Sequence, residues 1–152
     1  MKDFHQVGWE PNDAVQGEAE AIGYVVRLLL SSPAAHRDLS YVRYMAIPAI
    51  RAGRLHTYFN ARGEPVGFIL WARFSEFTES QIIRTELSAL HPSEWSEEGN
   101  LWILDIVSPF NNLRHMLRKF ISQNNTTDSV SIRYARQKGG IRCIREVTIF
   151  TD

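Results

Sequence analysis

The chain has 152 residues, enough for one domain with a continuous buried core. Its hydrophobic share of 44% excludes a disordered chain, and 17 basic against 17 acidic residues leave no bulk charge that would direct it to nucleic acid or a membrane. Cys143 is the only cysteine, which excludes an internal disulfide, and no apolar run of the signal-peptide type lies near the N-terminus, so we expect a cytoplasmic protein.

Two helices are predicted at the start of one domain. Residues 1–17 are polar and are expected to form a flexible arm, and residues 18–152 form the single domain because no linker or repeat divides them. Apolar residues then recur at helical spacing up to Ser-Ser-Pro at 31–33, which should end the first helix. A second helical pattern covers residues 38–50, where Pro48 must bend or end the helix.

The middle of the chain changes to strand-like patterns. Residues 56–60 are aromatic and β-branched, and a turn at 61–64 separates them from residues 66–72. Because residues 66–72 are apolar on both faces, they predict a strand inside the sheet. Residues 76–90 return to helical spacing, and residues 101–107 (LWILDIV) predict another buried strand.

The C-terminal part predicts one more helix and two strands. Asn111 or Asn112 can cap a helix that runs through Phe120. Residues 130–134 and 144–150 alternate as strands on either side of a glycine pair. This order of elements predicts a mixed α/β (α+β) fold with a largely antiparallel central sheet flanked by helices.

Two residues stand out as candidates for catalysis. Asp105 is the one acid inside an apolar strand, where an ionised carboxylate needs a partner. It can pair with an arginine and serve the structure alone, or it can orient a histidine and stabilise its protonated form. His36 follows the first helix and is either a plain surface residue or a general base, since an ordinary pKa of about 6.5 suits proton removal from an amine near neutral pH.

Other signals are weaker. The five histidines and the single cysteine show no metal-ligand spacing, so no metal site is expected, and no glycine-rich phosphate loop occurs. Cys143 is interpreted as buried filler, and Trp71, Trp95 and Trp102 as core or interface residues.

Basic residues concentrate in the last quarter of the chain. They form either a solvated face or a docking surface for an acidic partner. The set consists of Arg114, Arg118, Lys119, Arg133, Arg136, Lys138, Arg142 and Arg145.

The sequence resembles the RTX-type toxin-activating lysine acyltransferases over residues 22–120, with a weaker similarity up to residue 150. Six ordered segments carry the resemblance: IGYV at 22–25, SSP at 31–33 with HRD at 36–38, IPAI at 47–50 with Gly53, EPVG at 64–67 with Trp71 and Ala72, EW at 94–95 with LWILDIVSPF at 101–110, and MLRKF at 116–120. Each segment alone is a weak signal, but six in this order rarely arise by chance.

The resemblance implies a fold similar to the GNAT acetyltransferases and the roles of three residues. His36 falls on the catalytic histidine of the family, Asp105 on its catalytic aspartate, and Ser32 on a supporting serine. The family takes a fatty acyl group from acyl carrier protein, without a cofactor, and transfers it to internal lysines of a protoxin. Relatives also form homodimers.

The resemblance further implies a partner for the basic residues. Acyl carrier protein is acidic, so Arg114, Arg118, Lys119 and Arg133 are candidate docking residues.

The chain departs from the family pattern near the candidate histidine. Two alanines separate Pro33 from His36 where relatives have one residue, and the stretch between Arg37 and Pro48 is short. Two alternatives therefore stay open. One is a GNAT-like N-acyltransferase that uses acyl-CoA on another amine, and the other is an inactive relative that binds a toxin or a carrier protein.

Overall fold

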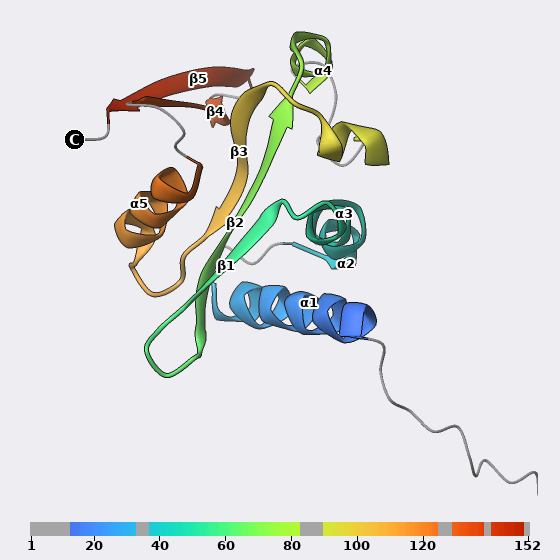
Figure 1. Cartoon of the computed structure of the whole chain (residues 1–152), viewed down its shortest axis with the longest axis vertical. Coiled ribbons are helices and arrows are strands. Elements are labelled where there is room, and N and C mark those ends of the chain that lie inside the picture. Colours follow the sequence, from blue (N-terminus) through green and yellow to red (C-terminus); the bar gives the residue numbers. More distant parts are fainter. Residues whose placement is uncertain (1–12, 33–36, 83–89, 125–128, 139–140, 151–152) are drawn as a thin grey trace, which may run out of the picture.

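The structure is a computed structural model that describes residues 13–32, 37–82, 90–124, 129–138 and 141–150. Its elements follow the predicted order of helices, hairpin, helix, strand, helix and two strands (Figure 1). The helices are α1 (Asp13–Ser31), α2 (Leu39–Tyr41), α3 (Ile47–Arg51), α4 (Glu76–Ile82) and α5 (Leu113–Asn124). The strands are β1 (Leu55–Phe59), β2 (Pro65–Phe74), β3 (Asn100–Val107), β4 (Ser129–Lys138) and β5 (Ile141–Phe150).

The described strands form one open sheet in the order β1-β2-β3-β4-β5. Every neighbouring pair is antiparallel except β3 and β4, which run parallel. The parallel pairing is short and extends only from Leu101 opposite Ile132 to Ile103 opposite Tyr134. The mixed α/β architecture with a largely antiparallel sheet is confirmed, and it is consistent with a GNAT-like fold.

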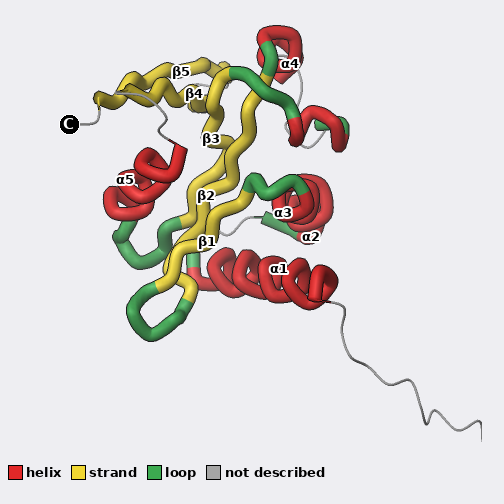
Figure 2. The backbone as a smooth tube through the Cα atoms, viewed as in Figure 1, coloured by secondary structure: helices red, strands yellow, loops and turns green. Residues whose placement is uncertain are grey.

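Helices cover both faces of the sheet, as the two layers in Figure 2 show. On one face, Met116 and Phe120 of α5 pack against Ile69 and Ile103. On the other face, α3 and the 3-10 helix Pro92–Ser96 pack against alternate residues of the same strands, and α1 covers the adjacent part of the sheet. Because successive strand residues point to opposite faces, the strand β2 is buried on both sides, as its sequence predicts.

The first helix begins earlier than predicted. The helix α1 starts at Asp13, so residues 13–17 are helical and do not belong to an arm, while residues 1–12 lie outside the described residues. Its end at Ser31 is confirmed. The apolar spacing also includes Leu30, but this residue is 81% exposed, because the buried stripe runs through Val25, Leu28 and Leu29.

Pro48 does not end the second helix. The helical path continues from Leu39 to Arg51, with a π-helical turn at Val42–Ala46 directly before α3. The N–H of Ile47 donates to the carbonyl of Val42, five residues back. A proline ring clashes with the carbonyl four residues before it, and the wider turn lets the chain accept Pro48 at the start of α3.

The remaining boundaries differ less. The strands β4 and β5 extend beyond the predicted residues 130–134 and 144–150, because the two strands pair along their whole length. The predicted helix 76–90 is described as far as Ile82, and residues 83–89 lie outside the described part. Asn112 precedes α5, but its side chain accepts from the Ser108 hydroxyl and donates to the Val66 carbonyl.

Candidate active site

A β-bulge in β3 decides where Asp105 points. Leu70 lies opposite Asp105 and Trp71 lies opposite Ile103, so Leu104 is the extra residue of β3. Trp102 lies on the α3 face, so strict alternation along β3 would turn position 105, three residues later, toward α5. The extra residue instead places the Asp105 side chain on the Leu70 face of the sheet, beside α2 and α3.

The Asp105 carboxylate is held by the chain segment that follows His36. The Arg37 Nη2 atom lies 2.8 Å from Asp105 Oδ1, and the Tyr41 hydroxyl donates to Oδ2 at 2.6 Å. The backbone N–H of Ile106 donates to Oδ1 at 2.9 Å. The carboxylate side chain remains 16% exposed, so these partners fix it without sealing it from solvent.

Tyr41 is a neutral donor in this cluster. Burial of the ring raises the pKa of its phenol, and the negative charge of Asp105 and the hydrogen bond to it raise that pKa further. The Arg37 guanidinium acts in the opposite direction and lies 5.3 Å from the centre of the Tyr41 ring. The hydroxyl therefore keeps its proton throughout the ordinary pH range.

Asp105 is among the residues that line an apolar groove of about 520 Å³. It lies where β3 and β4 are no longer paired, between α5 and the β4–β5 hairpin. Its lining residues are Ile103, Leu104, Asp105, Ile106, Leu113, Leu117, Ile132, Tyr134, Ala135, Val147 and Ile149. Asp105 is the one carboxylate among them, so a charged group stands beside a groove of hydrocarbon side chains.

A second, more polar cavity of about 390 Å³ lies next to the groove. Ile106 and Leu113 line both, so these two side chains form the wall between them. The second cavity also contacts Ser32, Arg37, Ser108 and Asn111. Arg37, which pairs with Asp105, thus lines the cavity next to the groove that Asp105 lines.

Of the three predicted site residues, the structure describes Ser32 and Asp105 but not His36. Ser32 lines the polar cavity, and its backbone N–H donates to the carbonyl of Leu29 at the end of α1. His36 lies outside the described residues, so its contact with Asp105 stays a prediction. The arginine partner considered as the structural interpretation of Asp105 exists and is Arg37.

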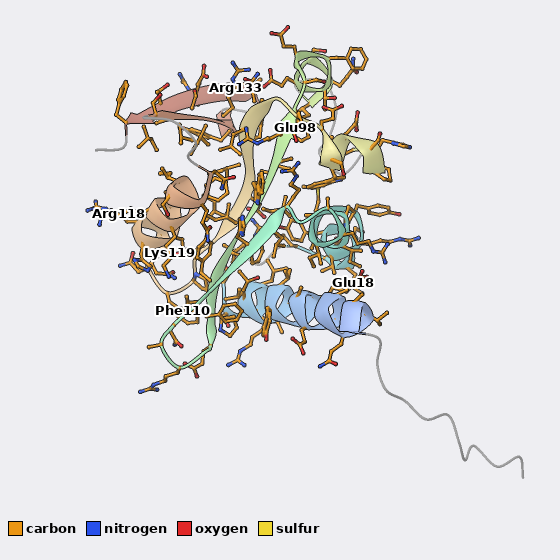
Figure 3. The ribbon with its side chains drawn as sticks, viewed as in Figure 1. Glu18, Glu98, Phe110, Arg118, Lys119 and Arg133 are labelled. Carbon is orange, nitrogen blue, oxygen red and sulfur yellow. The ribbon has the colours of Figure 1, made fainter. Side chains whose placement is uncertain are left out.

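The four candidate docking residues do not lie on one surface. Arg114, Arg118 and Lys119 are exposed on α5. Arg133 lies apart from them at the β4–β5 hairpin (Figure 3), opposite Trp102, on the face of the sheet away from α5. Its Nη1 atom lies 2.8 and 2.7 Å from the two carboxylate oxygens of Glu79.

The other residues singled out in the sequence mostly belong to the fold. Trp95 and Trp102 are buried core residues, as predicted, and so is Trp71. Cys143 lies on β5 opposite Arg136, and its side chain is outside what the structure describes. Within the described residues, no group of three or more His, Cys, Asp or Glu side chains could hold a metal ion.

His56 is held by the aromatic rings of Trp71 and Phe120. Its imidazole stacks on Trp71 at 5.6 Å, and burial lowers its pKa. The described helices include none that is both long and apolar enough to cross a bilayer.

The open sheet with helices on both faces is consistent with a GNAT-like α+β fold. The profile of HlyC, the RTX toxin acyltransferase family, matches residues 14–151. The chain therefore belongs to the RTX toxin acyltransferase family. It is also similar to the RTX-II toxin-activating lysine-acyltransferase ApxIIC of Actinobacillus pleuropneumoniae, with 24% identity over 112 residues, or 70% of this chain and 68% of that protein.

Proposed function

We propose that this acyltransferase moves a fatty acyl group from acyl carrier protein to internal lysines of an RTX-type protoxin. One observation carries the proposal: Asp105 is the one charged residue among the described residues that line the apolar groove between α5 and the β4–β5 hairpin. A fatty chain needs an apolar cavity, and its thioester must end beside the polar groups that act on it. The relative from Actinobacillus is described as a toxin-activating lysine-acyltransferase, which supports the same substrate class.

The proposed chemistry is direct transfer. The lysine nitrogen attacks the thioester carbonyl carbon, His36 accepts the proton that the amine loses, and the carbon–sulfur bond breaks. The thiolate of the carrier leaves and is protonated to a thiol. Asp105 orients the imidazole and stabilises its protonated form. Because Arg37 already offsets the charge of Asp105, orientation is the larger part of that role.

The polar cavity fits the approach of the acceptor. It shares Ile106 and Leu113 with the groove, so a lysine entering there would approach the groove from the other side of these two residues, beside the Arg37 that pairs with Asp105. Ser32 and Ser108 line it and offer hydroxyl groups to an approaching polar chain.

One helix links the groove to the proposed carrier. Leu113 and Leu117 of α5 line the groove, and Arg114, Arg118 and Lys119 of the same helix are exposed beside them. An acidic carrier protein that docks on these three cations would have its acyl thioester close to the groove. Arg133 has no part in this surface because it is paired with Glu79 on the other face.

The test is an acylation assay with the purified full chain, acyl-loaded carrier protein and an RTX-type protoxin. A protoxin lysine that gains the mass of the acyl chain supports the proposal. The same assay with acyl-CoA in place of the loaded carrier protein separates the two donors. Tight binding of the protoxin without any acyl transfer, across several chain lengths, would instead establish an inactive binding protein.

A further inference from the structure

We propose that Tyr41 is a positioning residue that keeps one oxygen of Asp105 available to the catalytic base. This inference rests on the proposed function, in which Asp105 orients His36. Tyr41 lies in the short stretch between Arg37 and Pro48, where the chain departs from the family pattern, and no motif of the sequence marks it.

The backbone of Tyr41 is fixed from the N-terminal side. Asp38 caps α2, and its Oδ1 atom accepts from the N–H of Ser40 at 2.9 Å and from that of Tyr41 at 3.3 Å. The ring packs against the buried residues on the α3 face of the sheet. The hydroxyl therefore reaches Asp105 from a helix that is held at both its cap and its core side.

The partners of Asp105 are distributed unequally between its two oxygens. Oδ1 accepts from Arg37 and from the N–H of Ile106, while Oδ2 accepts from Tyr41. A carboxylate oxygen has two lone pairs, so the described contacts fill Oδ1 and leave one acceptor position on Oδ2. The N–H group of a catalytic base that hydrogen-bonds to Asp105 must use this remaining position on Oδ2. The hydrogen bond from Tyr41 sets the direction in which that position points.

Without the hydroxyl, the arginine would compete for the same oxygen. A guanidinium presents parallel N–H groups that match both oxygens of a carboxylate, and the bidentate pair is its preferred geometry. The Tyr41 hydroxyl at 2.6 Å holds the carboxylate with Oδ2 turned to α2. Its loss would let the carboxylate rotate onto Arg37 with both oxygens and withdraw Oδ2 from the base.

The test is Tyr41→Phe, which keeps the ring and removes the hydroxyl alone. We expect kcat for acyl transfer to fall about tenfold, with KM for the acyl carrier changed less than twofold. Arg37 and Tyr41 are the charged and titratable side chains that contact Asp105 in the described residues.

Tyr44→Phe is the matched control. Tyr44 is an exposed tyrosine on the same helical path, and its ring contacts Arg43. Tyr44→Phe should leave kcat and KM unchanged, and thermal unfolding should show that both variants are folded. A Tyr41→Phe enzyme with wild-type kcat would overturn the positioning role. Full activity of Asp105→Asn would instead remove the proposed function on which it depends.

Discussion

Two carboxylate–arginine pairs in this protein differ in what surrounds them. Glu79 of α4 lies within 2.8 Å of Arg133 through each of its oxygens and also accepts from the indole of Trp102 at 2.7 Å. It is 8% exposed. Asp105 meets Arg37 through a single oxygen and opens onto the apolar groove.

The difference distinguishes an acid that joins elements of the fold from the acid proposed to serve catalysis. The neighbours of Glu79 tie α4 to β3 and β4. Asp105 accepts as many hydrogen bonds and its arginine partner is comparably close, but it lines the apolar groove, and its side chain is 16% exposed against 10% for that of Glu79. An ion pair alone therefore does not identify the role of a buried acid, whereas a cavity beside it favours a functional one.

The largest expected effect is the loss of acyl transfer when Asp105 or its proposed partner His36 is replaced. Asp105→Asn and His36→Ala should each reduce the rate of acyl transfer at least about a hundredfold, because each removes one half of the proposed base. Mass spectrometry of the protoxin lysines gives the rate. A loss of less than about tenfold for Asp105→Asn, or roughly 1.4 kcal/mol of barrier, would make the acid structural.

The converse change is Glu79→Gln. It removes the charge that Arg133 pairs with, and a hydrogen bond to a charged group contributes about 2 kcal/mol to stability. Urea unfolding should show a loss of that size, while the rate of acyl transfer at a temperature where the variant is folded stays within about twofold of wild type. A stable Glu79→Gln protein with a hundredfold slower rate would reverse the roles assigned to the two acids.

The groove beside Asp105 can be filled from α5. Leu117→Trp adds an indole to its lining and should favour short acyl chains over long ones by about tenfold, since an added ring occupies space that the end of a long chain needs. The measurement is the ratio of rates with octanoyl and palmitoyl carrier protein. Leu30→Trp, at an exposed leucine of α1, is the control and should leave the ratio unchanged.

The smallest expected effect concerns the exposed basic residues of α5. Arg118→Glu should raise KM for the acyl carrier about fivefold at low salt, and added salt should reduce the difference because exposed charges are screened. Arg62→Glu, in the exposed turn between β1 and β2, is the charge-matched control. Equal effects of the two reversals would show that net charge, and not the α5 surface, governs carrier binding.

The sequence by itself determined the order of the elements and the identity of the central acid. Residues 66–72 are apolar on both faces, and residues 101–107 are apolar except for one carboxylate. Periodicity and composition therefore predict two buried strands, with Asp105 as the one charge inside the second. These signals are local, and each depends on residues within a few positions of one another. The family also follows from sequence, because six ordered segments carry it.

Only the tertiary structure decided how that acid is used. Leu104 reads as an ordinary strand residue, yet the bulge there turns Asp105 away from α5 and toward Arg37 and Tyr41, more than 60 positions earlier in the chain. Arg133 looks like the arginines of α5 until strand alternation places it on the opposite face beside Glu79. Register and facing depend on pairing between distant segments, and no local pattern carries that information.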